Sequence, residues 1–227
     1  MSVTTQTSTI EPFSLSVPQS ELDDLQTRLE RTRWPDAETV SDTSQGPPLA
    51  KIQALCDRWR NGYDWRRCEA LLNGFGQYRT EIDGLGIHFL HVRSPEADAL
   101  PLLMTHGWPG SVLEFRHVIG PLTNPAAHGA AGQQAFHLVI PTLPGFGFSD
   151  KPTTAGWNVS RVADAWIELM RRLGYDRWAA QGGDWGAMVT TTIGYKAPPG
   201  LVGIHLNMAM FQPTEPAASA NTSTTRV

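Results

Sequence analysis

The sequence is poor in cysteine, in long apolar runs and in clustered positive charge. Its two cysteines, Cys56 and Cys68, are too few for a disulfide framework and lack histidine partners at metal-ligand spacing, so we expect reduced core thiols and no metal. No run of about 18 apolar residues is present, which excludes a transmembrane helix. A net charge of −4, with both signs interspersed, offers no basic stripe for a phosphate backbone. Nucleic acid is therefore excluded as a partner.

Residues 1–10 also lack the basic and apolar segments of a secretory signal. We therefore expect a cytoplasmic, soluble protein without a membrane anchor. With 227 residues, 41% of them hydrophobic and 18% charged, the chain has the composition of a globular protein with a sizeable core. Nothing in the sequence fixes its oligomeric state.

The first third of the chain is predicted to be helical. Apolar residues recur there at helical spacing in three places: Leu22, Leu25 and Leu29; Ile52, Leu55 and Trp59; and Leu71 with Leu72. Ser20 is expected to cap the first helix, which should end before Pro35, and Asp64 is expected to open the third.

After Gly76 short apolar strands alternate with amphipathic helices. Asp83-Gly84 predicts a hairpin between the first two strands. The expected strands cover residues 78–82, 87–92, 102–105, 137–141, 178–181 and 202–207, and the expected helices cover 112–122, 159–173 and 186–196. Such alternation predicts an α/β fold with a mostly parallel sheet, whose ligand lies beyond the carboxyl ends of the strands.

Changes of composition divide the chain into four predicted segments. They are a disordered N-terminus (1–12), a helical region (13–75), a partial α/β core (76–212) and a disordered tail (213–227).

The segment from Gln181 to Gly186 lies between a predicted strand and a predicted helix and has the form of a nucleophile elbow. In that turn the nucleophile has a strained backbone, and small residues two before and two after it let strand and helix approach. Gly182 and Gly186 occupy those places around Asp184. A carboxylate here is suited to in-line attack on a strained sp³ carbon, giving an enzyme ester. An alkylating substrate is therefore favoured over an acylating one.

A second loop, Thr105-His106-Gly107-Trp108-Pro109-Gly110, follows the first predicted parallel strand. In an α/β-hydrolase the loop at this place supplies one backbone N–H of an oxyanion hole, and the residue after the nucleophile supplies the other. The N–H groups of Trp108 and Trp185 are therefore the candidate donors. Alternatively, Asp184 only caps the following helix and the His-Gly loop is a simple turn. The presence of both loops in this order favours the hydrolase.

Four residues near these loops are expected to line an apolar substrate pocket: Trp108, Pro109, Phe146 and Trp185. Large aromatic side chains are equally common in a core, and that alternative stays open. His106 is expected to be a hydrogen-bonded structural histidine and not a general base.

The chain resembles the microsomal-type epoxide hydrolase family between Phe13 and about Pro213. The motifs that carry the resemblance are His106-Gly107-Trp108-Pro109-Gly110, Gly182-Gly183-Asp184-Trp185-Gly186, the loop Pro141 to Ser149, and the N-terminal segment Phe13 to Asp36 with Thr32-Arg33-Trp34-Pro35-Asp36. The resemblance implies an α/β-hydrolase fold preceded by a helical N-terminal meander.

The resemblance also implies a reaction. Asp184 would open a small apolar epoxide from the backside while two cap-domain tyrosines bind the leaving oxygen. A water activated by a histidine, itself oriented by an acid, would then attack the ester, and the oxyanion would form against Trp108 and Trp185. The product is a vicinal diol, as in epoxide detoxification, and no cofactor is needed.

In this fold the acid and the histidine follow the nucleophile in the chain. His205, in a predicted strand, and Glu215, in the polar tail, are poor candidates for these roles, and Tyr195 is a weak substitute for a cap tyrosine. The cap domain and last strands of the family are also missing from the sequence. We therefore expect the given chain not to turn over, and residues 201–206 to form an exposed apolar edge that promotes aggregation.

Two other functions remain open at this point. A haloalkane dehalogenase uses the same aspartate elbow, although its members typically lack a helical meander like that of residues 13–72. A non-catalytic pseudoenzyme would hold an apolar ligand in the retained half-pocket.

Overall fold

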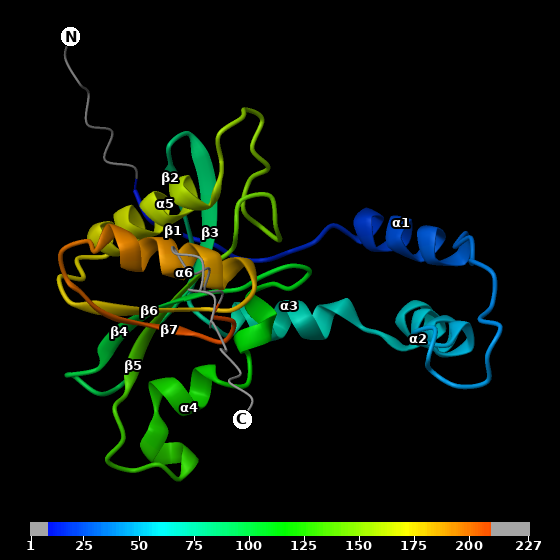
Figure 1. Ribbon diagram of the computed structural model, residues 1–227, viewed down its shortest axis with the longest axis horizontal. Coiled ribbons are helices and arrows are strands. Elements are labelled where there is room, and N and C mark those ends of the chain that lie inside the picture. The colour runs from blue at the N-terminus through cyan, green and yellow to red at the C-terminus, as the bar shows by residue number, and fades with distance from the viewer. Residues whose placement is uncertain (1–8, 210–227) are drawn as a thin grey trace, which may run out of the picture. The chain divides into compact units, whose positions relative to one another are not determined.

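The computed structural model describes residues 9–209, so the two terminal segments predicted to be disordered lie largely outside the described residues. Residues Pro12–Gln77 form one compact unit, and the sheet with its helices forms a second. Figure 1 labels the helices and strands of both units.

The N-terminal unit holds helices α1 (Gln19–Glu30), α2 (Leu49–Gly62) and α3 (Trp65–Asn73). Asp64 caps α3 as predicted, because its carboxylate accepts the Arg66 N–H at 2.9 Å. The prediction for α1 was wrong: its N-cap is Pro18, two residues before Ser20, and no side chain bonds there. Proline has the fixed φ that helix entry tolerates, and it has no N–H that needs a partner.

Side chains of α3 hold the extended segment that precedes α1. The Asn73 side chain exchanges two hydrogen bonds of 2.8 Å with the backbone of Leu15, and the buried Glu69 carboxylate accepts the Val17 N–H at 2.6 Å. Arg66 adds an ion pair of 2.7 Å to Glu69. These bonds supply partners for backbone groups that belong to no helix or sheet.

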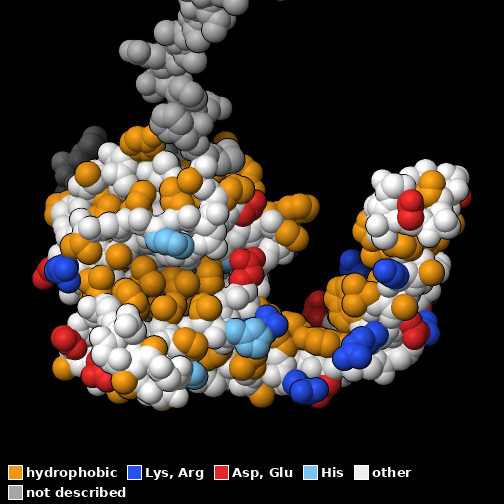
Figure 2. Space-filling model, turned by 60° about the horizontal axis from the view of Figure 1, so that its bottom comes forward, with side chains coloured by type: hydrophobic (Ala, Val, Ile, Leu, Met, Phe, Trp, Pro, Cys, Tyr) orange, Lys and Arg blue, Asp and Glu red, His pale blue; other side chains and the backbone are white. Residues whose placement is uncertain are grey.

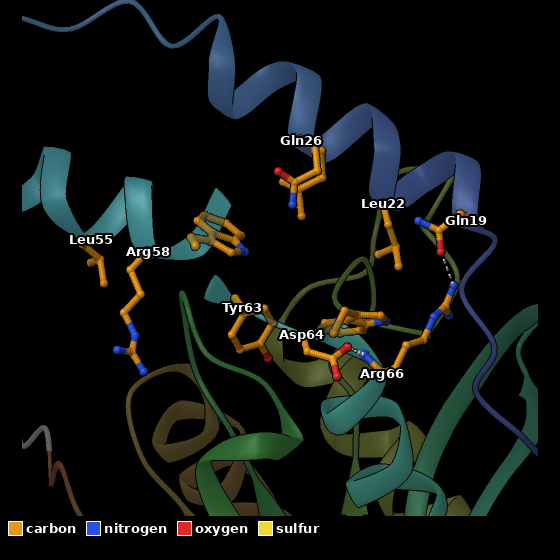
Figure 3. A pocket seen from close by; sticks show the side chains of 11 residues that line it. Gln19, Leu22, Gln26, Leu55, Arg58, Tyr63, Asp64 and Arg66 are labelled. Carbon is orange, nitrogen blue, oxygen red and sulfur yellow. Dashed lines mark hydrogen bonds between the residues drawn. The ribbon is translucent and has the colours of Figure 1, made fainter. Parts of the chain in front are cut away.

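A groove of about 600 Å³ lies within this unit, between α1, α2 and the start of α3 (Figure 3). Leu22, Leu55, Trp59 and Tyr63 are among the residues that line it. Its one carboxylate, Asp64, is engaged in capping α3. The groove therefore presents no uncommitted carboxylate among the residues that line it.

The second unit is built on a mixed sheet with the strand order β1-β2-β3-β5-β4-β6-β7. The strands are β1 (Glu11–Pro12), β2 (Gln77–Ile82), β3 (Leu85–Val92), β4 (Leu100–Thr105), β5 (Phe136–Pro141), β6 (Trp178–Gly182) and β7 (Leu201–Leu206). Asp83 and Gly84, both at positive φ, form the predicted turn between β2 and β3. In the part of the sheet ordered β5-β4-β6-β7 all neighbouring strands are parallel, whereas β3 pairs with β5 in the antiparallel direction. The predicted α/β-hydrolase fold is confirmed, and its sheet is mixed, with parallel pairs among β4, β5, β6 and β7.

Helices α5 (Val159–Arg172) and α6 (Trp185–Lys196) lie together on one face of the sheet (Figure 1). The Asn158 side chain caps α5 by accepting the Arg161 N–H at 3.0 Å. The inner face of α5 is fully buried at Trp166, Leu169 and Met170. At roughly 2 kcal/mol for each large buried side chain, this helix is a main source of the stability of the sheet unit.

The helix predicted for residues 112–122 is wrong. The segment instead forms a 3₁₀ turn, η1 (Val112–Phe115), followed by the short helix α4 (Ile119–Thr123). Pro121 explains the break, because proline fits the first turn of a helix but not its interior. The expectation that both cysteines are core thiols holds for Cys68, whereas the free thiol of Cys56 is only partly buried.

The other sheet face, on the side of α4, is more open (Figure 2). A groove of about 730 Å³ crosses it. Its lining includes Leu102, Met104, Phe115, Leu122, Ala180 and Ile204. The edge strand of the described sheet, β7, leaves Val202 and Ile204 exposed. In residues 9–209 no helix combines the length and apolarity that crossing a lipid bilayer demands.

We expect Leu169→Ala to lower the free energy of unfolding by about 2–5 kcal/mol, because it opens a cavity in a fully buried position of α5. Denaturant unfolding measures the loss. Tyr195→Ala, at an 85% exposed site on α6 of the same unit, should change it by about 0.5 kcal/mol or less. Equal losses in the two variants would refute the assigned core.

The exposed β7 edge should cause self-association, because unpaired strand edges template pairing between chains. Val202→Lys places a charge on that edge and should raise the monomer fraction in size-exclusion chromatography. Tyr195→Lys, which adds the same charge away from the edge, should not. A monodisperse wild-type monomer would contradict the expectation.

Candidate active site

Asp184 lies at the turn between β6 and α6 with φ 52° and ψ −124°. Few non-glycine residues adopt positive φ, and this one marks the strained turn that a nucleophile elbow requires. A Cβ on Gly182 would overlap the backbone of Gly186, and a Cβ on Gly186 would overlap the carbonyl of Thr105. Both positions therefore need glycine so that α6 can approach the two central strands.

The register of the sheet brings the two predicted loops together. Strands β4 and β6 are parallel neighbours, and Thr105 at the end of β4 pairs with Gly182 at the end of β6. Strand β5, which follows β4 in the chain, pairs with one edge of β4, and β6 pairs with the other edge. This is a topological switch point, where the loops diverge and leave a crevice beyond the strand ends.

Within that crevice the Trp108 N–H donates to Asp184 Oδ1 at 2.7 Å. Hydrogen bonds from the backbone N–H groups of Trp108 and, to a lesser degree, Trp185 hold the pKa of the Asp184 carboxyl below its ordinary value of 3.8. No helix-cap bond is made by the Asp184 side chain, which removes the alternative that it only caps α6. The carboxylate is therefore ionised at neutral pH, and one of its oxygens is bonded to the Trp108 N–H.

Gly107 also needs to be glycine, because a Cβ there would overlap the Asp184 carboxylate. The preceding residue, His106, is 1% exposed. Its Nδ1 lies 3.0 Å from the Gly107 carbonyl and its Nε2 accepts the Leu143 N–H at 3.1 Å. Burial lowers the pKa of His106, so the ring stays neutral. His106 is the hydrogen-bonded structural histidine that was predicted, and it links this loop to the loop after β5.

Of the four residues predicted to line the substrate pocket, Trp108, Trp185 and Pro109 are exposed. Phe146 is half-buried and packs edge-on against the His106 ring, with centroids 5.5 Å apart. A cavity of about 370 Å³ lies beside the elbow, and its lining includes Phe146 and Trp185 but neither Trp108 nor Pro109. The two tryptophans are thus not core residues.

The weak candidates from the sequence lie away from this crevice or outside the described residues. His205 is exposed on β7 and lines the groove on the open sheet face. Tyr195 is exposed near the end of α6, and Glu215 lies outside the described residues.

Two groups of residues near Asp184 were not predicted from the sequence. Trp157, Val159 and Val189 line the small cavity together with Phe146, and their apolar character next to a loop was the available signal. Glu114 is a second carboxyl group near Asp184, and the charge of Asp184 contributes to raising the pKa of Glu114. Its position four residues after Gly110 indicates that it lies near Asp184 only when the turn of the loop is already known.

Comparison with known proteins places this geometry in a family. Residues 10–115 match the family described as epoxide hydrolase N terminus, and residues 101–223 match the alpha/beta hydrolase fold family. A Stigmatella aurantiaca protein whose name assigns it as an epoxide hydrolase is 62% identical over 90% of this chain and 46% of its own length. Epoxide hydrolase 1 of Oryctolagus cuniculus is 37% identical over 89% of this chain and 45% of its own length.

Solved structures agree with the sequence relatives. An enantioselective mutant of the Aspergillus niger epoxide hydrolase has a TM-score of 0.80 and 32% identity, covering 95% of this chain and 57% of its own. The juvenile hormone epoxide hydrolase of Bombyx mori has a TM-score of 0.78 and 32% identity, covering 89% of this chain and 54% of its own.

The chain spans about half the length of the curated relatives it matches. The matched half includes the helical unit, the elbow and the loop after β4. This chain belongs to the epoxide hydrolase family, with an epoxide hydrolase N-terminal region followed by an α/β-hydrolase fold.

Proposed function

We propose that Asp184 is the nucleophile of an epoxide-opening reaction and that the Trp108 and Trp185 N–H groups form its oxyanion hole. The observation that carries the proposal is the 2.7 Å bond from Trp108 N to Asp184 Oδ1 in a strained strand-to-helix turn. This bond holds one carboxylate oxygen against main-chain donors and leaves Oδ2 as the nucleophile.

In the proposed first step Oδ2 attacks a ring carbon of the epoxide from behind. A new C–O ester bond forms, the ring C–O bond breaks, and the released alkoxide takes a proton from an acid donor. Oδ1 becomes the ester carbonyl oxygen and already lies in the oxyanion hole. No movement of the loop after β4 is then needed before the second step.

In the second step, which we propose for the whole protein, water attacks the ester carbonyl carbon. Charge develops on Oδ1, where the two N–H groups stabilise it. The Cγ–Oδ2 bond breaks, and Oδ2 leaves as a hydroxyl of the vicinal diol after taking one proton of the water. The second proton returns to the acid donor of the first step, and the water oxygen remains on Asp184 as a carboxylate oxygen. No step requires a metal or an organic cofactor.

The cavity of about 370 Å³ beside the elbow suits an apolar substituent of the epoxide. Its lining is dominated by Phe146, Trp157, Val159, Val189 and Trp185. A cavity of this size accommodates a phenyl ring or a short alkyl chain. We therefore propose small apolar epoxides as substrates. A cytoplasmic location remains part of the proposal.

The experiment that tests the assignment is intact-mass spectrometry after exposure to styrene oxide, with diol measured in parallel. Wild type should form either a covalent adduct that maps to Asp184 or diol at a rate above the blank. Asp184→Ala should lower both by at least about 100-fold, since it removes the reacting atom. Asp98→Ala, which removes an exposed carboxylate from the same unit, should react like wild type.

Absence of adduct and diol in well-folded wild type would sink the enzyme proposal and favour an apolar-ligand binding protein. A parallel arm with an alkyl bromide tests the dehalogenase alternative. Reaction with the bromide but not with the epoxide would decide for it.

The rate of adduct formation should depend on pH through one ionisation, because only the carboxylate attacks. The pKa of Asp184 is lowered by hydrogen bonds from Trp108 and Trp185, so the reactive form persists below pH 3.8. The midpoint of the fall in the blank-corrected rate should therefore lie below pH 3.8, with little change between about pH 7 and about pH 5. A fall centred at or above pH 5 would contradict a carboxylate stabilised by these donors.

A further inference from the structure

Glu114 lies on the far side of the loop that donates to Asp184. Ser111 caps the 3₁₀ turn η1, because its side chain accepts the Leu113 N–H at 3.3 Å, and the Glu114 N–H donates to the Ser111 carbonyl at 3.0 Å. This turn folds the Glu114 side chain back over Gly110. A Cβ on Gly110 would fall on the Glu114 carboxyl group. The carboxyl therefore occupies space that only a glycine leaves free.

The Glu114 carboxyl is packed against Gly110 and lies close enough to Asp184 to respond to its charge. The pKa of Glu114 is raised, first by partial burial and then by the charge of Asp184, while the Ser111 main chain acts in the opposite direction. Two carboxyl groups thus hold the loop after β4. Asp184 accepts the Trp108 N–H, and the Glu114 carboxyl packs against Gly110 two residues later.

We propose that Glu114 is a positioning residue that holds Gly110 and Ser111 in place and thereby keeps the Trp108 N–H pointed at Asp184. It touches neither substrate nor reacting atoms. The inference rests on the proposed function, because the oriented donor is the one that stabilises the oxyanion.

If Glu114 served only the stability of the fold, its removal would lower the free energy of unfolding. We do not expect this loss. The turn η1 already has its cap in Ser111, and Glu114 itself is exposed. Its removal should therefore leave the free energy of unfolding within about 0.5 kcal/mol of wild type. The direction of the Trp108 N–H, by contrast, depends on where the loop is held.

The experiment reads the Trp108 N–H directly. Labelling the chain with ¹³C-carbonyl glycine and ¹⁵N-tryptophan limits a carbonyl-filtered amide spectrum to Trp108 and Trp157, which alone follow glycine. Loss of the downfield shift in Asp184→Ala identifies Trp108. In Glu114→Ala the Trp108 signal should move toward its position in Asp184→Ala while Trp157 stays. Glu114→Gln, whose amide group has nearly the size of the carboxyl and can still pack over Gly110, should restore most of the shift.

The alkylation rate of Asp184 by styrene oxide should fall about tenfold in Glu114→Ala and much less in Glu114→Gln. Glu96→Ala, at another exposed glutamate, is the matched control for both measurements. Gly110→Ala provides a second route, because its methyl group displaces the Glu114 carboxyl without removing it, and it should shift Trp108 in the same direction.

An unmoved Trp108 signal in folded Glu114→Ala overturns the proposal. If Glu114→Ala does not fold, an unmoved signal in Gly110→Ala overturns it. Failure of wild type to react with epoxide refutes the proposed function alone, because the amide spectrum still decides the role of Glu114.

Discussion

The hydrogen bond from Trp108 N to Asp184 Oδ1 is the contact on which the site depends. It joins a loop after β4 to a turn after β6, so it exists only because the two strands are parallel neighbours that end level with each other. It also lowers the pKa of the Asp184 carboxyl and engages Oδ1, which leaves Oδ2 as the oxygen proposed to react. Three glycines, Gly107, Gly182 and Gly186, make room for it.

Much of this arrangement could be predicted from the sequence, because local rules determine it. The strand and helix periods gave the α/β order, and the pattern of Gly182, Asp184 and Gly186 is a chemical requirement of a tight turn. An aspartate at this place is suited to the attack on carbon that is proposed here. Family membership then followed from motifs far apart in the chain, and the comparisons confirm it.

The rest depended on tertiary structure. Ser20 is a better capping residue than Pro18, yet α1 begins after Pro18, since bonds from α3 hold the preceding chain extended. The helix predicted over 112–122 breaks where Pro121 must lie in a first turn. Glu114 could not be connected to Asp184 from spacing alone, because the fold-back of η1 brings its carboxyl over Gly110.

Both groups that face Asp184 in the proposed oxyanion hole belong to the main chain, whereas the indole rings of Trp108 and Trp185 are 68% and 52% exposed. Evolution can therefore replace either ring without deleting a donor, as long as the backbone path is kept. Charge stabilisation and the shape of the surrounding surface are thereby uncoupled. Such separation allows a lineage to change which molecules it accepts while the reactive centre is inherited intact.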